Sequence, residues 1–263
     1  MKKILFFMLA FIQIGCLFSV ATCAEEKSFS WYCKHVKDHA QPGLDAALQF
    51  IQNYNGFYAD LSHADPNDSD KVIYLTFDAG YENGNVAKIL DVLSEENVPA
   101  AFFVLGHLVT HETELVKRMA KEGHLVCNHT VRHKDMTTLD EVAFTKELKE
   151  LEALYREKIG EELSPYYRPP KGCFNEENLK IAQKLGYATI FWSFAYADWD
   201  NDRQPSQEKA LQKILENLHN GEVMLLHPTS ATNAAILKDL ISQIKAQGYR
   251  FGTLDELTRR GDG

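Results

Sequence analysis

Cysteine is scarce in this chain, which has five among its 263 residues, two of them in the first 24. The other three, Cys33, Cys127 and Cys173, are too few and odd in number to form the disulfide framework of a small secreted domain. Cys127 and Cys173 each adjoin a motif described below, so one disulfide bridge between them is possible. The alternative, and the more common role of an unpaired cysteine, is a small buried residue of the core.

Basic clusters and low-complexity segments are also absent. Lysine and arginine total 28 against 37 acidic residues, which gives a formal net charge of −9. A protein of this charge without a basic run is a poor ligand for nucleic acid and is not drawn to anionic surfaces. The composition therefore argues against nucleic-acid binding, and nothing in it identifies a protein partner.

Long apolar runs are absent after residue 20. The run Ile4–Val20 follows the basic start Met1-Lys2-Lys3 and leads into small residues that end at Ala24. This order is typical of a signal peptide. We therefore predict that residues 1–24 are removed after Ala24 and that the protein is exported across the membrane. In the alternative the segment is not cleaved and retains the protein at the membrane, although the run is short for a span.

The remaining chain divides near residue 70. Residues 25–70 are aromatic and polar with weak periodicity, and we interpret them as an N-terminal extension lying over the main domain. Residues 71–258 alternate between short apolar runs and helical periodicity. About seven β/α units in series predict an α/β fold with a parallel sheet, open or closed, and this unit count favours a barrel. The predicted strands are 72–77, 100–105, 124–128, 166–168, 189–192, 223–226 and 249–253, and the predicted helices are 85–96, 114–122, 139–159, 176–185, 207–218 and 233–247.

Ionisable side chains follow five of these strands. They are Asp78, His129 with His133 four residues later, Arg168, Asp198 beside Trp199, and His227. Each has a simpler role when taken alone, such as a turn, a helix cap, a core histidine or a surface ion pair. In a parallel α/β barrel, however, the C-terminal ends of the strands converge on one face. One shared site explains all five better than chance does.

The residue types at these positions suit metal-assisted hydrolysis. On one helical turn, His129 and His133 could offer two imidazole nitrogens to one divalent ion, for which Zn²⁺ is the first choice. Such an ion polarises a carbonyl and lowers the pKa of bound water. Asp78 could take the proton from that water, and His227 could protonate the leaving group. The reaction predicted is hydrolysis of an amide or an ester.

These residues resemble the motifs of the polysaccharide deacetylase (NodB-homology) family, carbohydrate esterase family 4, in order from about residue 71 to residue 254. The matching segments are Thr76-Phe77-Asp78-Ala79, His129-Thr130-Val131-Arg132-His133, Arg168-Pro169-Pro170-Lys171-Gly172, Asp198-Trp199 and Leu225-Leu226-His227. The resemblance implies a distorted (β/α)7 barrel with the NodB-like fold. It also implies metal-dependent removal of N- or O-acetyl groups from sugars.

The resemblance also implies a role for each matching residue. Asp78 is the expected catalytic base, Arg168 is expected to hold it in place, and His227 is the expected general acid. His129 and His133 are the expected metal ligands, and the backbone N–H of Lys171 is an expected oxyanion donor. Asp198 and Trp199 are expected to support and line the pocket, and Leu226 is expected to contact the acetyl methyl group. Two positions depart from the family pattern. Ala79 replaces the aspartate that is the usual third metal ligand, and Ala195 replaces an earlier aspartate of the fourth motif.

Further segments resemble the δ-lactam-biosynthetic de-N-acetylases of spore-forming bacteria. These are Gly80-Tyr81-Glu82-Asn83-Gly84, Phe191-Trp192-Ser193 and the aromatic N-terminal extension. That group usually has asparagine where this chain has Ala79. The resemblance implies an N-acetylmuramic acid deacetylase acting on peptidoglycan glycan strands of the cell wall or spore envelope, whose product becomes muramic δ-lactam in spore cortex. The alternatives are a deacetylase of N-acetylglucosamine polymers such as chitooligosaccharide, and a non-catalytic sugar-binding homologue that has lost its metal.

Overall fold

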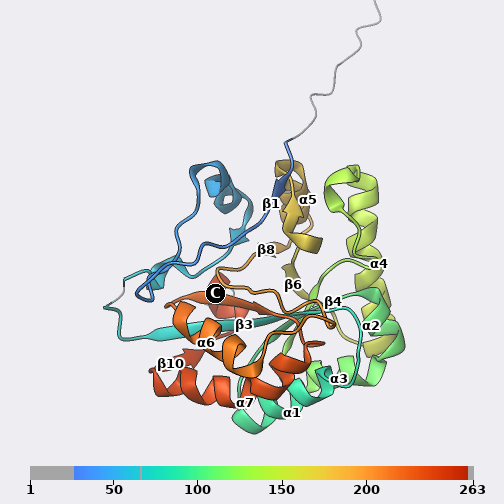
Figure 1. The fold of residues 1–263 in the computed structure, drawn as a ribbon. Coiled ribbons are helices and arrows are strands. Elements are labelled where there is room, and N and C mark those ends of the chain that lie inside the picture. The colour runs from blue at the N-terminus through green and yellow to red at the C-terminus, as the bar shows by residue number, and fades with distance from the viewer. Residues whose placement is uncertain (1–26, 66, 260–263) are drawn as a thin grey trace, which may run out of the picture.

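A nine-residue run rich in β-branched and aromatic side chains forms β3 (Lys71–Ala79), on which the sheet is built. The computed structural model describes residues 27–65 and 67–259, so the predicted signal peptide lies outside the described residues. β3 pairs in parallel with β4 (Ala101–Val104), β9 (Glu222–Leu226) and β10 (Tyr249–Phe251). These pairings make β3 the centre of the fold (Figure 1).

The sheet continues from β4 and curls back toward β9. It runs through β5 (Leu125–Asn128), β6 (Ser164–Tyr167) and β8 (Ala188–Ile190) to β2 (Gly56–Phe57). The segment after β8 makes a parallel bridge to β9 between Phe194 and Met224. The curled, parallel α/β sheet confirms the predicted distorted barrel.

Most of the helices cover the outer face of the sheet, whereas the last one packs Leu254 and Leu257 against the inner face. Their bounds are α1 Val86–Glu96, α2 Gly106–His111, α3 Thr113–Lys121, α4 Glu141–Ile159, α5 Glu176–Lys184, α6 Gln207–Asn217, α7 Ala231–Ala246 and α8 Leu254–Thr258. Side chains alternate along β3, so that Phe77 and Ala79 join the outer cluster with the helices while Val72 and Tyr74 face the inner cluster. The same alternation places Asp78 on the face opposite to Ala79.

The predicted elements agree with the structure to within a few residues, but several short elements were not predicted. Among them are α2, α8, β1 (Phe29–Ser30), β2 and β7 (Cys173–Phe174). Two-residue strands and five- or six-residue helices are too short to show a period in the sequence. Within the described ranges, no helix is both long enough and apolar enough to cross a membrane.

The three described cysteines are free, so the bridge between Cys127 and Cys173 does not form. Cys127 is buried in the inner cluster, which confirms the core interpretation for this residue. Cys33 and Cys173 are only partly buried.

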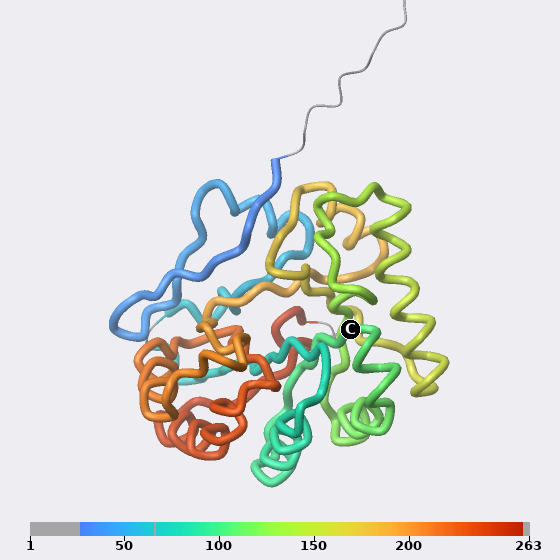
Figure 2. The backbone as a smooth tube through the Cα atoms, turned by 45° about the vertical axis from the view of Figure 1, so that its right-hand side comes forward, coloured from blue at the N-terminus to red at the C-terminus, as the bar shows by residue number. Residues whose placement is uncertain are grey.

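The N-terminal extension packs on one end of the fold through an aromatic cluster. Trp31, Tyr58 and the 3-10 helix Ala46–Tyr54 contact Phe174 and Phe191 of the main domain. Figure 2 shows the extension, in blue, beside the yellow segment that contains β7 and α5. Through β2 the extension also adds a parallel strand to the sheet beside β8.

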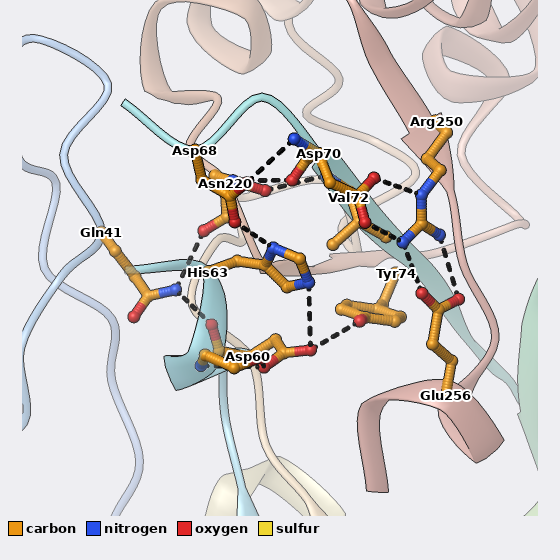
Figure 3. A network of polar contacts seen from close by, with 11 residues as sticks. Gln41, Asp60, His63, Asp68, Asp70, Val72, Tyr74, Asn220, Arg250 and Glu256 are labelled. Atoms are coloured by element: carbon orange, nitrogen blue, oxygen red, sulfur yellow. Dashed lines mark hydrogen bonds and ion pairs between the residues drawn. The ribbon is translucent and has the colours of Figure 1, made fainter. Parts of the chain in front are cut away.

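A polar network fastens the end of the extension to the start of β3 (Figure 3). Tyr74 donates a hydrogen bond to the Asp60 carboxylate at 2.7 Å, and Gln41 donates to the Asp60 backbone carbonyl at 2.8 Å. Burial and then the hydrogen bond to Asp60 raise the pKa of Tyr74, so its hydroxyl remains a donor. Asn220 accepts from the backbone N–H of Val72 at 2.8 Å.

Tyr74→Phe is expected to lower the free energy of unfolding by about 1–2 kcal/mol, because Asp60 is 8% exposed and loses a buried donor. Urea unfolding measures this change. Tyr249→Phe, which removes a hydroxyl from another buried tyrosine, is the matched control and should cost less. An equal loss in both variants would contradict a specific role for the bond to Asp60.

Candidate active site

Three predicted site residues from three different strands meet at the C-terminal edge of the sheet. Asp78 lies near the end of β3, Arg168 follows β6 and His129 follows β5. Arg168 Nη1 donates to Asp78 Oδ1 at 2.9 Å, and His129 Nε2 lies 3.5 Å from Asp78 Oδ2. The two carboxylate oxygens therefore face different partners.

Arg168 is fully buried and held on several sides. Its Nε donates to the carbonyl of Ile190 at 3.0 Å, and its Nη2 donates to Thr76 Oγ1 at 2.9 Å and to the carbonyl of Phe191 at 3.3 Å. The guanidinium also lies 4.1 Å from the centre of the Phe103 ring. Backbone carbonyls, a hydroxyl and an aromatic face thus position this cation although Ala195 offers no carboxylate.

The surroundings of Asp78 favour its ionised form. Burial by itself raises the pKa of this carboxyl, but its interactions with His129, Arg168 and His227, including the hydrogen bond from Arg168, outweigh burial and hold the pKa below its ordinary value. Asp78 is therefore a carboxylate at neutral pH and can accept a proton.

His129 and His133 lie on a loop, and this corrects the helical geometry predicted for the pair. Positive φ angles of 72° at Thr130 and 55° at His133 turn the chain so that the two ring centres are 5.0 Å apart. The Thr130 hydroxyl accepts from the His133 backbone N–H at 2.9 Å and fixes this turn. The spacing of four residues brings the imidazoles together by a different local structure.

Both imidazoles are neutral at pH 7. Burial lowers the pKa of His129, and burial followed by the field of His129 lowers the pKa of His133 to about 4. His129 Nδ1 lies 2.9 Å from the Arg168 carbonyl, which accepts its proton and leaves Nε2 with the free lone pair. This is the protonation pattern of a metal-ligating histidine.

The structure supplies a donor set of two histidines for a divalent ion. No group of three or more His, Cys, Asp or Glu side chains is arranged to hold a metal within residues 27–65 and 67–259. Ala79 adds no ligand, since its methyl group is fully buried in the outer cluster. His129 and His133 thus fit an ion that keeps open coordination positions.

His227 forms the other half of the site with Asp198. Asp198 is 0% exposed; one of its oxygens lies 2.7 Å from His227 Nδ1, and the other accepts from the His227 backbone N–H at 2.8 Å. Burial lowers the pKa of His227, but the hydrogen bond and charge of Asp198, with the charge of Asp78, outweigh it and raise the pKa overall. The ring is therefore oriented with Nε2 free and protonated more readily than an ordinary histidine.

Two residues that support the site were not predicted from the sequence. Asn233 donates to Asp198 at 2.6 Å and to the His227 carbonyl at 3.1 Å. Glu147 on α4 is 2% exposed and accepts hydrogen bonds from the backbone and side chain of Arg132 at 3.2 and 3.0 Å. These bonds stabilise the loop that contains His129 and His133. In the sequence Asn233 looks like a residue of a helix start and Glu147 like one of many helix-surface acids.

The Lys171 peptide adopts an uncommon conformation. Lys171 has φ 57° and ψ 10° within the turn Pro170–Gly172, in the left-handed region that residues with a Cβ rarely adopt. Such a conformation persists only where neighbouring structure imposes it.

Two predicted pocket residues lie at opposite extremes of exposure. Trp199 is 60% exposed, and its ring centre lies 6.1 Å from that of His227. Leu226 is 0% exposed and belongs to the outer cluster, so its predicted contact with an acetyl methyl group is wrong. By strand alternation Leu225 shares the inner face of β9 with Val223, and a contact from this strand would come from Leu225.

Comparisons with known proteins agree with this architecture. A family model described as polysaccharide deacetylase matches residues 65–190. The chain is 38% identical over 238 residues to peptidoglycan-N-acetylmuramic acid deacetylase PdaA of Bacillus subtilis, covering 90% of this chain and 88% of that protein. It is 33% identical over 200 residues to a peptidoglycan-N-acetylglucosamine deacetylase of Bacillus cereus, covering 74% of this chain and 91% of that protein.

Solved structures resemble this fold as well. The structure of Bacillus subtilis PdaA, a family 4 carbohydrate esterase, matches with a TM-score of 0.83 and 37% identity over 89% of this chain and 98% of that one. A pseudoenzyme of the same esterase family from Bacillus anthracis matches with a TM-score of 0.69 and 28% identity, covering 77% of this chain and 68% of that one.

Proposed function

Because this chain belongs to the polysaccharide deacetylase family, we propose that it is a hydrolase that removes the N-acetyl group from N-acetylmuramic acid in peptidoglycan. The observation that carries the proposal is the paired arrangement of Asp78 with Arg168 and of His227 with Asp198. The pKa of the Asp78 carboxylate is lowered, which favours its ionised form, and the pKa of the His227 imidazole is raised, which favours its protonated form. Those are the two states that a base and an acid need before turnover.

The proposed mechanism assigns one step to each group. Asp78 takes a proton from the attacking water, whose oxygen bonds to the acetyl carbonyl carbon. The backbone N–H of Lys171 binds the oxyanion that forms there. His227 then gives its proton to the amide nitrogen as the C–N bond breaks, which yields acetate and a free amine. Exposed Trp199 would line the sugar side of the site.

His129 and His133 would hold a divalent metal ion, and two neutral imidazoles suit Zn²⁺. When bound, the ion polarises the acetyl carbonyl and lowers the pKa of water. His129→Ala and His133→Ala are each expected to weaken zinc binding by at least about tenfold, as measured by metal content after dialysis and by calorimetry with zinc alone. His35→Ala changes an exposed histidine of the N-terminal extension, whose ring contacts Asn217 and Phe194, and should bind zinc as the unmodified chain does. Unchanged zinc binding in both loop variants would contradict this assignment.

Similarity to PdaA supports muramic acid as the substrate, since it covers 90% of this chain and includes most of the N-terminal extension. The similarity to the N-acetylglucosamine deacetylase covers 74%. Peptide-stripped glycan strands analysed by mass spectrometry after incubation should lose acetyl from muramic acid and not from glucosamine. The reverse result would favour the glucosamine alternative. If muramic acid is the substrate, the amine freed by deacetylation would close on the lactyl group and form the muramic δ-lactam of spore cortex.

The alternative to an enzyme is a non-catalytic sugar-binding protein. Ala79 favours this alternative, because the metal ligand usual at this position is missing. Sugar binding without release of acetate, in the presence of added zinc, would support that alternative. Retention of the base, the acid and both histidines supports catalysis instead.

We also propose that residues 1–24 are a signal peptide, that 25–70 are an extension and that 71–258 form the deacetylase domain. Glycan strands of the cell wall or spore envelope would then be the partner. N-terminal sequencing of the exported protein should begin at Glu25, and a start at Met1 would favour a retained membrane segment.

A further inference from the structure

The first strand of the N-terminal extension runs beside the turn that contains Lys171. β1 pairs antiparallel with β7, with Phe29 opposite Phe174 and Ser30 opposite Cys173. The next residue, Trp31, donates its backbone N–H to the carbonyl of Gly172 at 2.8 Å. The extension thus contacts the backbone immediately after the proposed oxyanion donor.

The Trp31 side chain joins this turn to a second segment of the site. Its indole Nε1 donates to the carbonyl of Trp192 at 2.9 Å, and its ring stacks on Phe191 with centres 4.2 Å apart. Phe191 in turn offers its carbonyl to Arg168, the cation that contacts Asp78. Trp31 is 5% exposed, so these contacts are shielded from water.

The fit around Gly172 leaves little freedom for the turn. Gly172 has φ 66°, and a Cβ there would lie 2.9 Å from Trp31 Cβ and 2.9 Å from the Trp192 ring. The glycine is therefore enclosed between two tryptophans from distant parts of the sequence. Its neighbour Lys171 has the left-handed backbone, which needs such an external constraint.

We propose that Trp31 is a positioning residue that holds the Lys171 peptide in the orientation required to bind the oxyanion. The inference rests on the proposed function and extends the catalytic unit into the N-terminal extension. It predicts that loss of the indole hydrogen bond slows the chemical step more than it weakens substrate binding, since an oxyanion donor acts mainly in the transition state.

Trp31→Phe is the direct test, because it retains an aromatic ring for the stack on Phe191 and removes the indole donor that holds Trp192, whose ring lies against Gly172. We expect kcat per folded molecule to fall by about tenfold or more with KM little changed, since a misplacement of about 1 Å can cost about 100-fold. Amide hydrogen exchange in residues 171–173 should become faster. Deacetylation of peptide-stripped glycan strands, with zinc added, provides the rates.

Tyr58→Phe is the matched control. Tyr58 lies in the same aromatic cluster, 5.8 Å from Trp31 between ring centres, and its hydroxyl interacts with the backbone of Leu44. This variant should retain both kcat and the exchange pattern of residues 171–173, even if both variants unfold at lower urea concentration than the unmodified chain.

Two results separate this inference from the proposed function. If the unmodified chain deacetylates and Trp31→Phe has an unchanged kcat or unchanged exchange in residues 171–173, the inference about Trp31 is overturned and the proposed function stands. If the unmodified chain releases no acetate from any glycan, the proposed function fails and takes the inference with it.

Discussion

Asp78→Asn is expected to lower kcat by about 1,000-fold, within the range by which general acid–base groups accelerate proton transfer. An amide has nearly the shape of the carboxylate and can still accept the hydrogen bond from Arg168, but it cannot take a proton from water. Because the pKa of Asp78 lies below its ordinary value beside the buried Arg168 cation, the carboxylate is ionised and the loss should be present across the neutral pH range. Acetate release from peptide-stripped glycan measures it.

This substitution also leaves the buried guanidinium of Arg168 without its counter-charge. A fall in the free energy of unfolding is therefore expected, because an unpaired buried charge is costly. Rates must accordingly be expressed per folded molecule, with the folded fraction taken from urea unfolding. Asp239→Asn, an exposed position on α7, is the control and should change neither quantity. A kcat within tenfold of the unmodified chain would contradict Asp78 as the base.

The sequence was sufficient to predict that ionisable residues at several strand ends would meet in space. Asp78 follows an apolar run, and the barrel rule predicted that it would share one face with the residues at the other strand ends. Its contact with Arg168 was implied by the family resemblance. Residues at the ends of parallel strands converge because the strands share a direction. Long-range geometry of this kind therefore follows from local pattern and fold class.

Other features depend on contacts that no local pattern encodes. The loop at His129 and His133 is shaped by positive φ angles at Thr130 and His133, which helical spacing does not reveal. Asn233 supports Asp198 only because the loop after β8, which carries Asp198, meets the start of α7 in space. Trp31 looked like part of an aromatic extension of weak periodicity, and its contact with Gly172 spans much of the chain.

The face of a strand was the remaining source of error. Leu225 and Leu226 are adjacent and both apolar, so composition does not distinguish them, and a shift of one residue reverses the face. The alternation along β9 assigns Leu226 to the helices.

Asp198→Asn is expected to shift the alkaline limb of the pH–rate profile to lower pH. The general acid must be protonated before it can act, so activity falls as pH rises through the pKa of His227. Asp198 is the main cause of the raised pKa of His227, and burial, which lowers it, would act unopposed by that charge in the variant. We expect about a 100-fold loss of kcat/KM at pH 8 and a smaller loss at pH 6.

The same raised pKa of His227 also makes the free energy of unfolding depend on pH. The His227–Asp198 pair has its full effect on folding below the unfolded pKa of histidine, about 6.5, and loses it as pH rises through the higher folded pKa. The difference in unfolding free energy between the two chains should therefore be larger at pH 6 than at pH 9. Asp202→Asn, an exposed change in the same loop, should leave both profiles unchanged. An alkaline limb that stays in place in Asp198→Asn would mean that another group donates the proton, because the Asp198 carboxylate, 2.7 Å from Nδ1, contributes most to raising the pKa of His227.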